Sequence, residues 1–163
     1  MPKRMFKHYL HWRSWVIGAA ASIAVVALAA ESGVTPQQAI EARQSNLKDL
    51  GGAFKTVRDQ LRISSPNLQE IKLAAQQIKD LVADQDHWFP KGTGPESGIK
   101  TDAKAEIWTD ASGFASAQKE LAEQAPKLLT LANANDLPGL RSQVPVVGQT
   151  CKGCHDKYRV PKN

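Results

Sequence analysis

The sequence predicts an all-α fold, an antiparallel four-helix bundle. Past residue 30, apolar residues recur at helical spacings in four segments, and no stretch alternates in the way a strand would. Short connections between the first two and between the last two segments make these pairs antiparallel neighbours. Each apolar stripe is too narrow to bury itself, so four of them pack best around one shared axis. A bundle alone indicates no function.

The first two helices are predicted on either side of a short connection. Thr35 and Pro36 have the form of an N-cap followed by a first-turn proline, and the apolar stripe after them ends before Ser64. This first stripe consists of Ile40, Leu47, Leu50, Phe54, Val57 and Leu61. Asn67 restarts the chain, and the second helix runs as far as Val82. Its stripe consists of Ile71, Ala74, Ile78 and Leu81.

A long loop over residues 84–101, rich in Gly and Pro, separates the two predicted helix pairs. The third helix carries on one face Ile107, Ala111, Phe114, Leu121, Ala125, Leu128 and Ala132. Pro126 should bend it, because an internal proline removes a backbone hydrogen bond. The fourth helix starts near Asp136 with Pro138 in its first turn, and Pro145 predicts a second bend. Its apolar side consists of Leu137, Leu140, Val144, Val147, Cys151, Cys154 and Tyr158.

Residues 1–30 have the parts of a secretory signal. A basic segment without acids precedes an uncharged run over residues 15–30, and Ala27, Ala29 and Ala30 fit an A-x-A cleavage rule. At 1.5 Å per residue this run reaches about 24 Å, less than the roughly 30 Å of a membrane core, which favours cleavage over an uncleaved anchor. We therefore expect a domain over residues 31–163 that works in a bacterial periplasm without membrane attachment.

The charge distribution argues against nucleic-acid binding. The chain has 21 Lys and Arg against 16 Asp and Glu, but four of the basic residues and none of the acidic ones lie in the leader. In the remainder the two signs alternate on what we interpret as solvated helix faces, whereas phosphate binding needs a clustered basic surface. The presence of two cysteines also excludes a disulfide-dense scaffold.

Residues 151–155 read Cys-Lys-Gly-Cys-His, which is C-x-x-C-H, the attachment signature of c-type haem. In a helix, Cys151, Cys154 and His155 project from one flank. The thiols can form thioethers with the haem vinyl groups, and the imidazole can reach the iron as the proximal ligand. A thioredoxin-like redox pair would need a βαβ context, and zinc would need a further ligand close in space. The motif therefore predicts one covalently bound haem c, with His155 as the metal ligand.

The residue opposite His155 decides the chemistry of such an iron. The only methionines, Met1 and Met5, lie in the leader, so residues 31–163 contain none. His87 is the other histidine of that range, in a loop where a solvated side chain is the simpler interpretation, and a lysine ligand also stays open. The composition favours five-coordinate iron with an empty distal side, which would admit small neutral diatomics such as NO or CO.

Four stretches carry a resemblance to a known family. They are Arg43-Gln44-Ser45-Asn46-Leu47, Gly92-Thr93-Gly94, residues 102–108 and residues 148–159. On these stretches the chain, from Ala39 to its end, resembles the class II c-type cytochromes, in particular cytochrome c′. The resemblance implies a four-helix bundle with haem attached close to the C-terminus, often as a homodimer.

The resemblance also implies roles for single residues. Arg43 and Gln44 look like the pair that contacts the haem edge and its propionates, although a surface helix pair stays open. Leu47 falls where low-spin relatives place a methionine ligand and five-coordinate members an apolar side chain over the iron. Asp102 resembles a haem-contacting loop acid. Arg159 looks like an arginine beside the proximal imidazole, or a charge complementing the helix dipole.

The remaining aromatic residues are expected to pack. Phe54 should help to wall the haem pocket, while Trp88 and Trp108 are expected in packing roles. Pro145 departs from the family pattern.

The function predicted is a periplasmic, non-enzymatic c-type cytochrome that transfers electrons, binds NO or CO, or does both, with an unidentified redox partner. The alternative is a low-spin six-coordinate electron carrier with His87 or a lysine as the sixth ligand. A helical adaptor with an incidental C-x-x-C-H is the third possibility.

Overall fold

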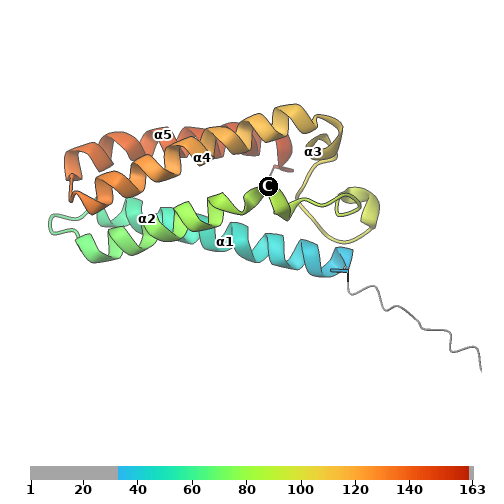
Figure 1. Ribbon diagram of the computed structural model, residues 1–163, viewed down its shortest axis with the longest axis horizontal. Coiled ribbons are helices and arrows are strands. Elements are labelled where there is room, and N and C mark those ends of the chain that lie inside the picture. The colour runs from blue at the N-terminus through green and yellow to red at the C-terminus, as the bar shows by residue number, and fades with distance from the viewer. Residues whose placement is uncertain (1–32, 162–163) are drawn as a thin grey trace, which may run out of the picture. The chain divides into compact units, whose positions relative to one another are not determined.

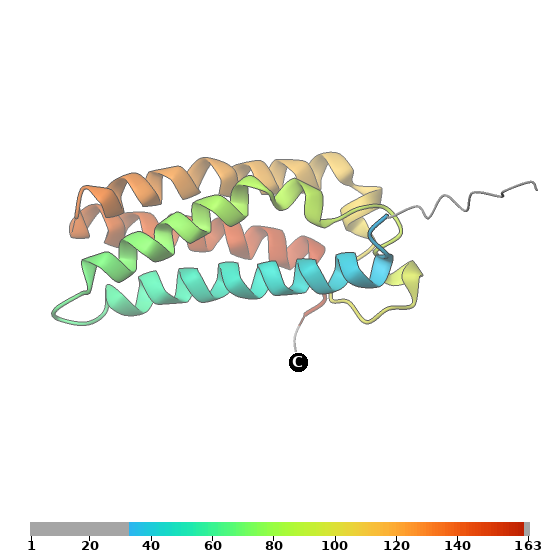
Figure 2. The same cartoon turned by 60° about the horizontal axis from the view of Figure 1, so that its bottom comes forward.

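The computed structural model describes residues 33–161, so the predicted leader and its cleavage site lie outside the described residues. The long helices are α1 (Pro36–Gln60), α2 (Leu68–Ala83), α4 (Ala111–Asn133) and α5 (Leu137–Tyr158). Shorter ones are the 3₁₀ helices η1 (Gln85–Trp88) and η2 (Pro95–Ser97) and the single turn α3 (Glu106–Thr109). The long helices run alternately up and down (Figures 1 and 2), and the described range contains no strand beyond one isolated bridge. The antiparallel four-helix bundle is confirmed.

Polar side chains begin three of the four long helices, α1, α2 and α5, where the sequence predicts starts. Thr35 and Gln38 form a capping box at α1, in which the Thr35 hydroxyl accepts from the Gln38 N–H and the Gln38 side chain accepts from the Thr35 N–H. Asn67 caps α2, and the carboxylate of Asp136 caps α5 by accepting from the Gly139 N–H at 2.9 Å. These bonds satisfy N–H groups that have no partner inside the helix.

The third predicted helix is two helices in the structure. The sequence predicts one face shared by Ile107 and Ala111, which is wrong because α3 ends at Thr109 and α4 begins at Ala111. Between them Asp110 takes φ −116° and ψ 54°, outside the helical region, and accepts from the Gly113 N–H at 3.2 Å. An aspartate side chain that binds backbone N–H groups in this way starts a new helix.

Neither internal proline ends its helix. Helix α4 continues through Pro126 and α5 continues through Pro145. The bends expected at these prolines stay predictions.

The core has two parts. The main cluster joins α1, α2, α4 and α5 and consists of Ala53, Val57, Leu61, Ile71, Ala74, Ala75, Ile78, Val82, Leu121, Ala125, Leu128, Ala132, Leu140 and Val147. A small cluster at the α3 end consists of Ala103, Ile107, Phe114 and Tyr158. The predicted α1 stripe is only partly buried, because Leu47 is 41% exposed and Leu50 and Phe54 are half-buried.

The seams between neighbouring helices are packed unequally. Helix α1 packs closely on α2, α2 on α4, and α4 on α5, whereas close backbone approaches between α1 and α5 are rare. In Figure 2 these two helices, cyan and red, form the fourth side of the bundle. We call this side the α1/α5 seam.

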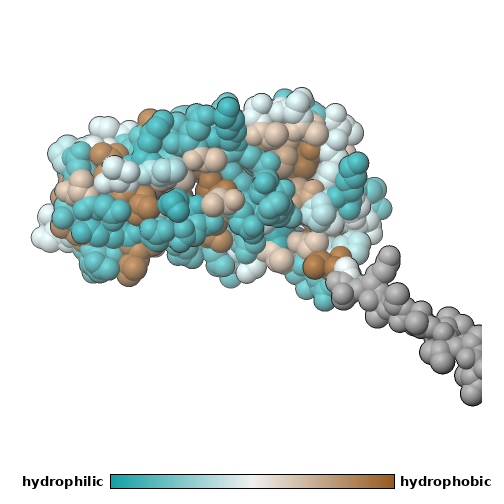
Figure 3. All heavy atoms as spheres, viewed as in Figure 1, coloured by the Kyte–Doolittle hydropathy of each residue, from teal (hydrophilic) through white to brown (hydrophobic). Residues whose placement is uncertain are grey.

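The outer surface is mainly polar. On the face shown in Figure 3, hydrophilic residues cover most of the helices and apolar residues form smaller patches. Among the helices of residues 33–161, none is long and apolar enough to span a membrane.

Candidate functional site

The C-x-x-C-H motif occupies the last two turns of α5. Cys151 is half-buried and packs against the main core, and Cys154 is half-buried against the small cluster. His155 follows in the same turn, exposed on the outside of the packed core. The two thiols therefore lie at the edge of the protein interior, with the imidazole directly beside them.

Burial raises the pKa of both thiols. The pKa of Cys154 rises to about 11, chiefly through burial and further through Cys151 and Glu120. Burial likewise raises the pKa of Cys151. Thiols that exchange disulfides work with a lowered pKa, about 7 in thioredoxin. This pair therefore lacks the electrostatics of a redox couple, which supports the sequence-based argument against one.

Phe54 defines the register between α1 and α5. A Cβ placed on Gly148 would lie 3.7 Å from Cζ of Phe54, so these two residues are side by side. The two helices are antiparallel, so moving toward the N-terminus of α1 and toward the C-terminus of α5 is a move in the same direction. Seven residues make about two turns, so a shift of seven from Phe54 and from Gly148 ends about 10 Å farther along the bundle, on the same face of each helix. Leu47 on α1 and His155 on α5 are the residues expected at that level of the α1/α5 seam.

The side chains along this seam fit a haem. Leu47 is 41% exposed, and Leu50 and Phe54 are half-buried, so their apolar surfaces are only partly covered by protein. A shallow hollow of about 200 Å³ opens between the same two helices toward their other ends, lined by Arg58, Leu61, Arg62, Arg141, Val144 and Pro145. The helix that carries the C-x-x-C-H motif thus borders a partly exposed apolar flank of α1, an arrangement that suits a flat apolar group attached to α5.

Arg43 is 2% exposed and holds the long loop. Its guanidinium donates to the Thr93 hydroxyl and carbonyl, both at 3.0 Å, and to the Thr101 hydroxyl at 2.9 Å. It also lies over the ring of Phe89, 4.8 Å from the centroid. Burial lowers the pKa of Arg43, but a guanidinium stays protonated in proteins. This role in fixing the loop was not predicted; an arginine within an apolar helical stripe is the signal that could have indicated it.

The next residue, Gln44, reaches the same loop. Its side-chain amide donates to the Lys100 carbonyl at 3.1 Å. The Arg43-Gln44 pair therefore ties α1 to the loop that precedes α3.

Asp102 and Arg159 come together at the end of α5. The Asp102 carbonyl accepts from the Val160 N–H at 2.8 Å, and Ala103 pairs with Arg159 in an isolated antiparallel bridge. Asp102 is exposed and Arg159 half-buried. The structure thus brings both predicted residues to the segment that directly follows His155.

The loop aromatic residues pack as expected. Trp88 is buried and donates to Asp84 at 3.3 Å, and Trp108 donates to the carbonyls of Phe89 and Pro90. His87, on η1, has a side chain 77% exposed, with Nε2 3.6 Å from Oδ1 of Asp86. This is the environment of a solvated loop histidine.

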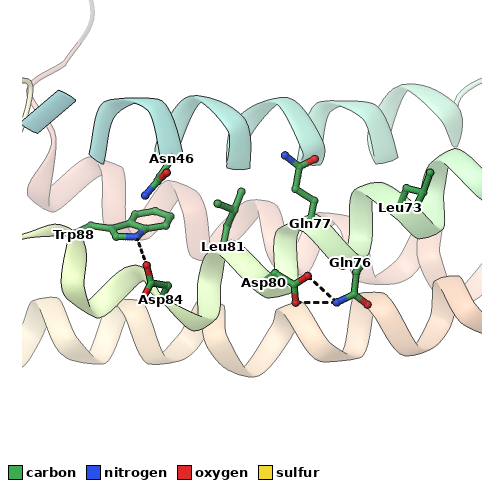
Figure 4. Close-up of a pocket in the computed structure, with 8 residues that line it drawn as sticks. All are labelled: Asn46, Leu73, Gln76, Gln77, Asp80, Leu81, Asp84 and Trp88. Carbon is green, nitrogen blue, oxygen red and sulfur yellow. Dashed lines mark hydrogen bonds between the residues drawn. The ribbon is translucent and has the colours of Figure 1, made fainter. Parts of the chain in front are cut away.

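A hollow of about 520 Å³ lies on a different side of the bundle, between α1, α2 and η1 (Figure 4). It is lined by Asn46, Leu73, Gln76, Gln77, Asp80, Leu81, Asp84 and Trp88. No thiol or imidazole lines it, so it is separate from the C-x-x-C-H motif. Within residues 33–161, no cluster of three or more His, Cys, Asp or Glu is arranged to hold a metal ion.

Comparison with known proteins identifies the family. The family model described as Cytochrome C' matches residues 38–159. The chain belongs to the cytochrome c′ family. Family membership implies haem c, and the two cysteines needed to attach it are present.

The match extends over almost the whole length of each relative. Cytochrome c′ of Alcaligenes xylosoxydans xylosoxydans is 35% identical over 128 residues, which is 78% of this chain and 97% of that protein. Cytochrome c′ of Rubrivivax gelatinosus is 33% identical over 127 residues, 76% of this chain and 95% of the relative. A solved structure of the Alcaligenes xylosoxidans protein, a ferrous variant with bound NO, has a TM-score of 0.71 at 32% identity and covers 80% of this chain and 99% of that one.

Proposed function

We propose that this chain is a periplasmic cytochrome c′ that holds one haem c covalently in the α1/α5 seam. Cys151 and Cys154 would hold the haem through thioethers, each made by adding S–H across a vinyl C=C bond so that sulfur and hydrogen both end on carbon. His155 would supply the imidazole ligand of the iron. The observation that supports the proposal is the contact between Phe54 and Gly148, from whose register Leu47 is expected at the level of His155.

Leu47 determines the chemistry of the distal side. Its side chain has no nitrogen, oxygen or sulfur, so it cannot ligate, and it keeps water away from the position opposite His155. A haem bound there supplies an iron that takes up or releases one electron and can bind a small neutral diatomic molecule. Without a hydrogen-bond donor at Leu47, NO and CO are favoured over O₂. The NO held by a ferrous variant of the Alcaligenes relative supports this choice.

The polar residues around the seam would contact the edge of the haem. The bonds from Arg43 to Thr93 and Thr101 use three of the five guanidinium N–H groups, and the others are suited to a propionate. Gln44, one residue on, completes that edge. Asp102 and Arg159 border the proximal side through the bridge that follows α5. Phe54 forms the wall next to Gly148.

The cellular role is non-enzymatic. None of these side chains needs to act as an acid, base or nucleophile, because the haem supplies the reactivity. The basic leader with its apolar run and small residues supports export to the periplasm. Family membership supports a homodimer and exchange of electrons with a redox partner.

The electronic absorption spectrum of the reduced holoprotein tests this function. A five-coordinate iron gives a broad high-spin Soret band and poorly resolved α and β bands, and the spectrum changes on adding CO. Sharp α and β bands without added ligand would instead show a sixth protein ligand, from His87 or a lysine. A colourless protein purified from periplasm would leave only a helical adaptor.

A further inference from the structure

The last turn of α5 is tied to the junction between α3 and α4. Helix α5 ends at Tyr158, three residues after His155. The side chain of Tyr158 is 3% exposed, and its ring packs edge-on against Phe114 with the centroids 5.1 Å apart. Its hydroxyl donates to Oδ2 of Asp110 at 2.8 Å. Both the apolar ring and the polar tip of Tyr158 are therefore fixed.

Asp110 uses its two oxygens for different purposes. Oδ1 accepts from the Gly113 N–H and caps α4, while Oδ2 accepts from Tyr158 and lies 2.5 Å from Nζ of Lys157. A Cβ on Gly113 would come within 2.6 Å of the Tyr158 hydroxyl, so this close approach requires glycine. The cap of α4 is thereby also the anchor of the end of α5.

The backbone around Tyr158 is held as well. The Lys104 N–H donates to the Tyr158 carbonyl at 3.0 Å, and the Val160 N–H donates to the Asp102 carbonyl at 2.8 Å. Cys154 packs against the small cluster to which Tyr158 belongs. His155 therefore lies inside a segment, from Cys154 to Val160, that is held by the residues before α3 and by Asp110 at the junction of α3 and α4.

The cap at the other end of α5 provides a matched comparison. Asp136 accepts from the Gly139 N–H at 2.9 Å, in the same Asp-x-x-Gly arrangement as Asp110 and Gly113. Among the described residues, its carboxylate receives no bond from a tyrosine or lysine. The two aspartates thus share the capping contact and differ in the contact with the haem-bearing turn.

We propose that Asp110, acting through Tyr158, is a positioning residue for His155. Residues three apart on a helix lie on adjacent rows of one surface, so the anchor at Tyr158 fixes the rotation of the turn that carries the imidazole. The inference rests on the proposed function, in which His155 is the proximal ligand. Asp110 acts on the imidazole through the backbone of this turn, which it keeps in one orientation.

The experiment compares three variants of the reduced holoprotein by resonance Raman spectroscopy of the Fe–His stretch. Tyr158→Phe keeps the ring against Phe114 and removes only the hydroxyl. Asp110→Asn keeps an N-cap, since asparagine caps well, and weakens the bond from Tyr158. Asp136→Asn is the control, with the same chemical change at the far end of α5.

We expect the Fe–His band to shift and broaden in Tyr158→Phe and in Asp110→Asn and to keep its native position and width in Asp136→Asn. An unchanged band in both test variants, or an equal change in the control, would overturn the positioning role while leaving His155 as the ligand. Absence of an Fe–His band in the unaltered protein would instead reject the proposed function. Circular dichroism of each variant shows whether it has kept the helical fold.

Discussion

The seam between α2 and α4 and the seam between α1 and α5 use the same kinds of residue but are filled differently. In the first, Ile71, Ile78 and Leu128 are at most 1% exposed, and the two helices pack closely. In the second, Leu47 is 41% exposed, Phe54 is half-buried, and the helices rarely approach. Apolar residues that are fully buried lie where protein atoms alone fill the core. Half-covered ones on a loosely packed seam mark the place where another group completes it.

The largest effect should come from removing the attachment to the second seam. Replacing both Cys151 and Cys154 by Ser abolishes the thioethers, so haem should be extracted completely by denaturation in acidic acetone, whereas the native protein retains it. Thr150→Ser, beside the motif, is the control and should retain its haem. Haem that stays with the double variant after extraction would show an attachment elsewhere.

Truncation in the packed seam should affect stability alone. Leu128 is fully buried, so Leu128→Ala should lower the free energy of unfolding by about 3 kcal/mol through lost burial and a cavity. Denaturant unfolding of the holoprotein measures this, and the absorption spectrum should stay native. A changed spectrum would mean that the packed seam also contacts the haem.

Arg43→Met tests how the loop is held over the bundle. The change leaves the Thr93 carbonyl and the Thr101 hydroxyl without their buried donor, so we expect a loss of about 2 kcal/mol in the free energy of unfolding. Gln44→Met, which removes one exposed bond to Lys100, should lose less than about 1 kcal/mol. Equal losses in the two variants would contradict the anchoring role of Arg43.

Truncation in the loosely packed seam should affect ligand binding more than stability. Leu47 is 41% exposed, so Leu47→Ala should change the free energy of unfolding by less than about 1 kcal/mol. It should also speed the association of CO with the reduced protein, because the side chain over the distal position becomes smaller. Stopped-flow CO binding measures this, and a native rate would place Leu47 away from the ligand.

Acid should act at the junction that holds the end of α5. Hydrogen bonds from Lys157 and Tyr158 hold the pKa of Asp110 below its usual range. A carboxyl with a lowered pKa in the folded state adds stability above its unfolded pKa, about 4, and this is lost as the pH falls further. The melting temperature should therefore fall less between pH 5 and pH 3 in Asp110→Asn than in the native protein. Parallel curves would show that this carboxyl does not contribute.

The sequence was informative where the determinants are local. The C-x-x-C-H motif lies within a helix, as expected, and the caps at Thr35, Asn67 and Asp136 lie where helix starts were expected. The break at Asp110 was missed because the apolar period continues across it, although its Asp-x-x-Gly pattern repeats that of Asp136.

Contacts between distant residues could not be predicted from the sequence. Arg43 binds Thr93 and Thr101, which lie 50 and 58 residues away along the chain. The partial exposure of Leu47 depends on how far α1 lies from α5, which no periodicity specifies.

The ferrous absorption spectra of Leu47→Met and Leu50→Met test most directly whether Leu47 lies opposite His155. Leu50 is half-buried on the same helix, about 4.5 Å farther along its axis, and serves as the matched control. We predict that Leu47→Met acquires the sharp α and β bands of six-coordinate iron and that Leu50→Met keeps the broad high-spin spectrum. An unchanged high-spin spectrum in Leu47→Met would contradict the assignment of the distal side.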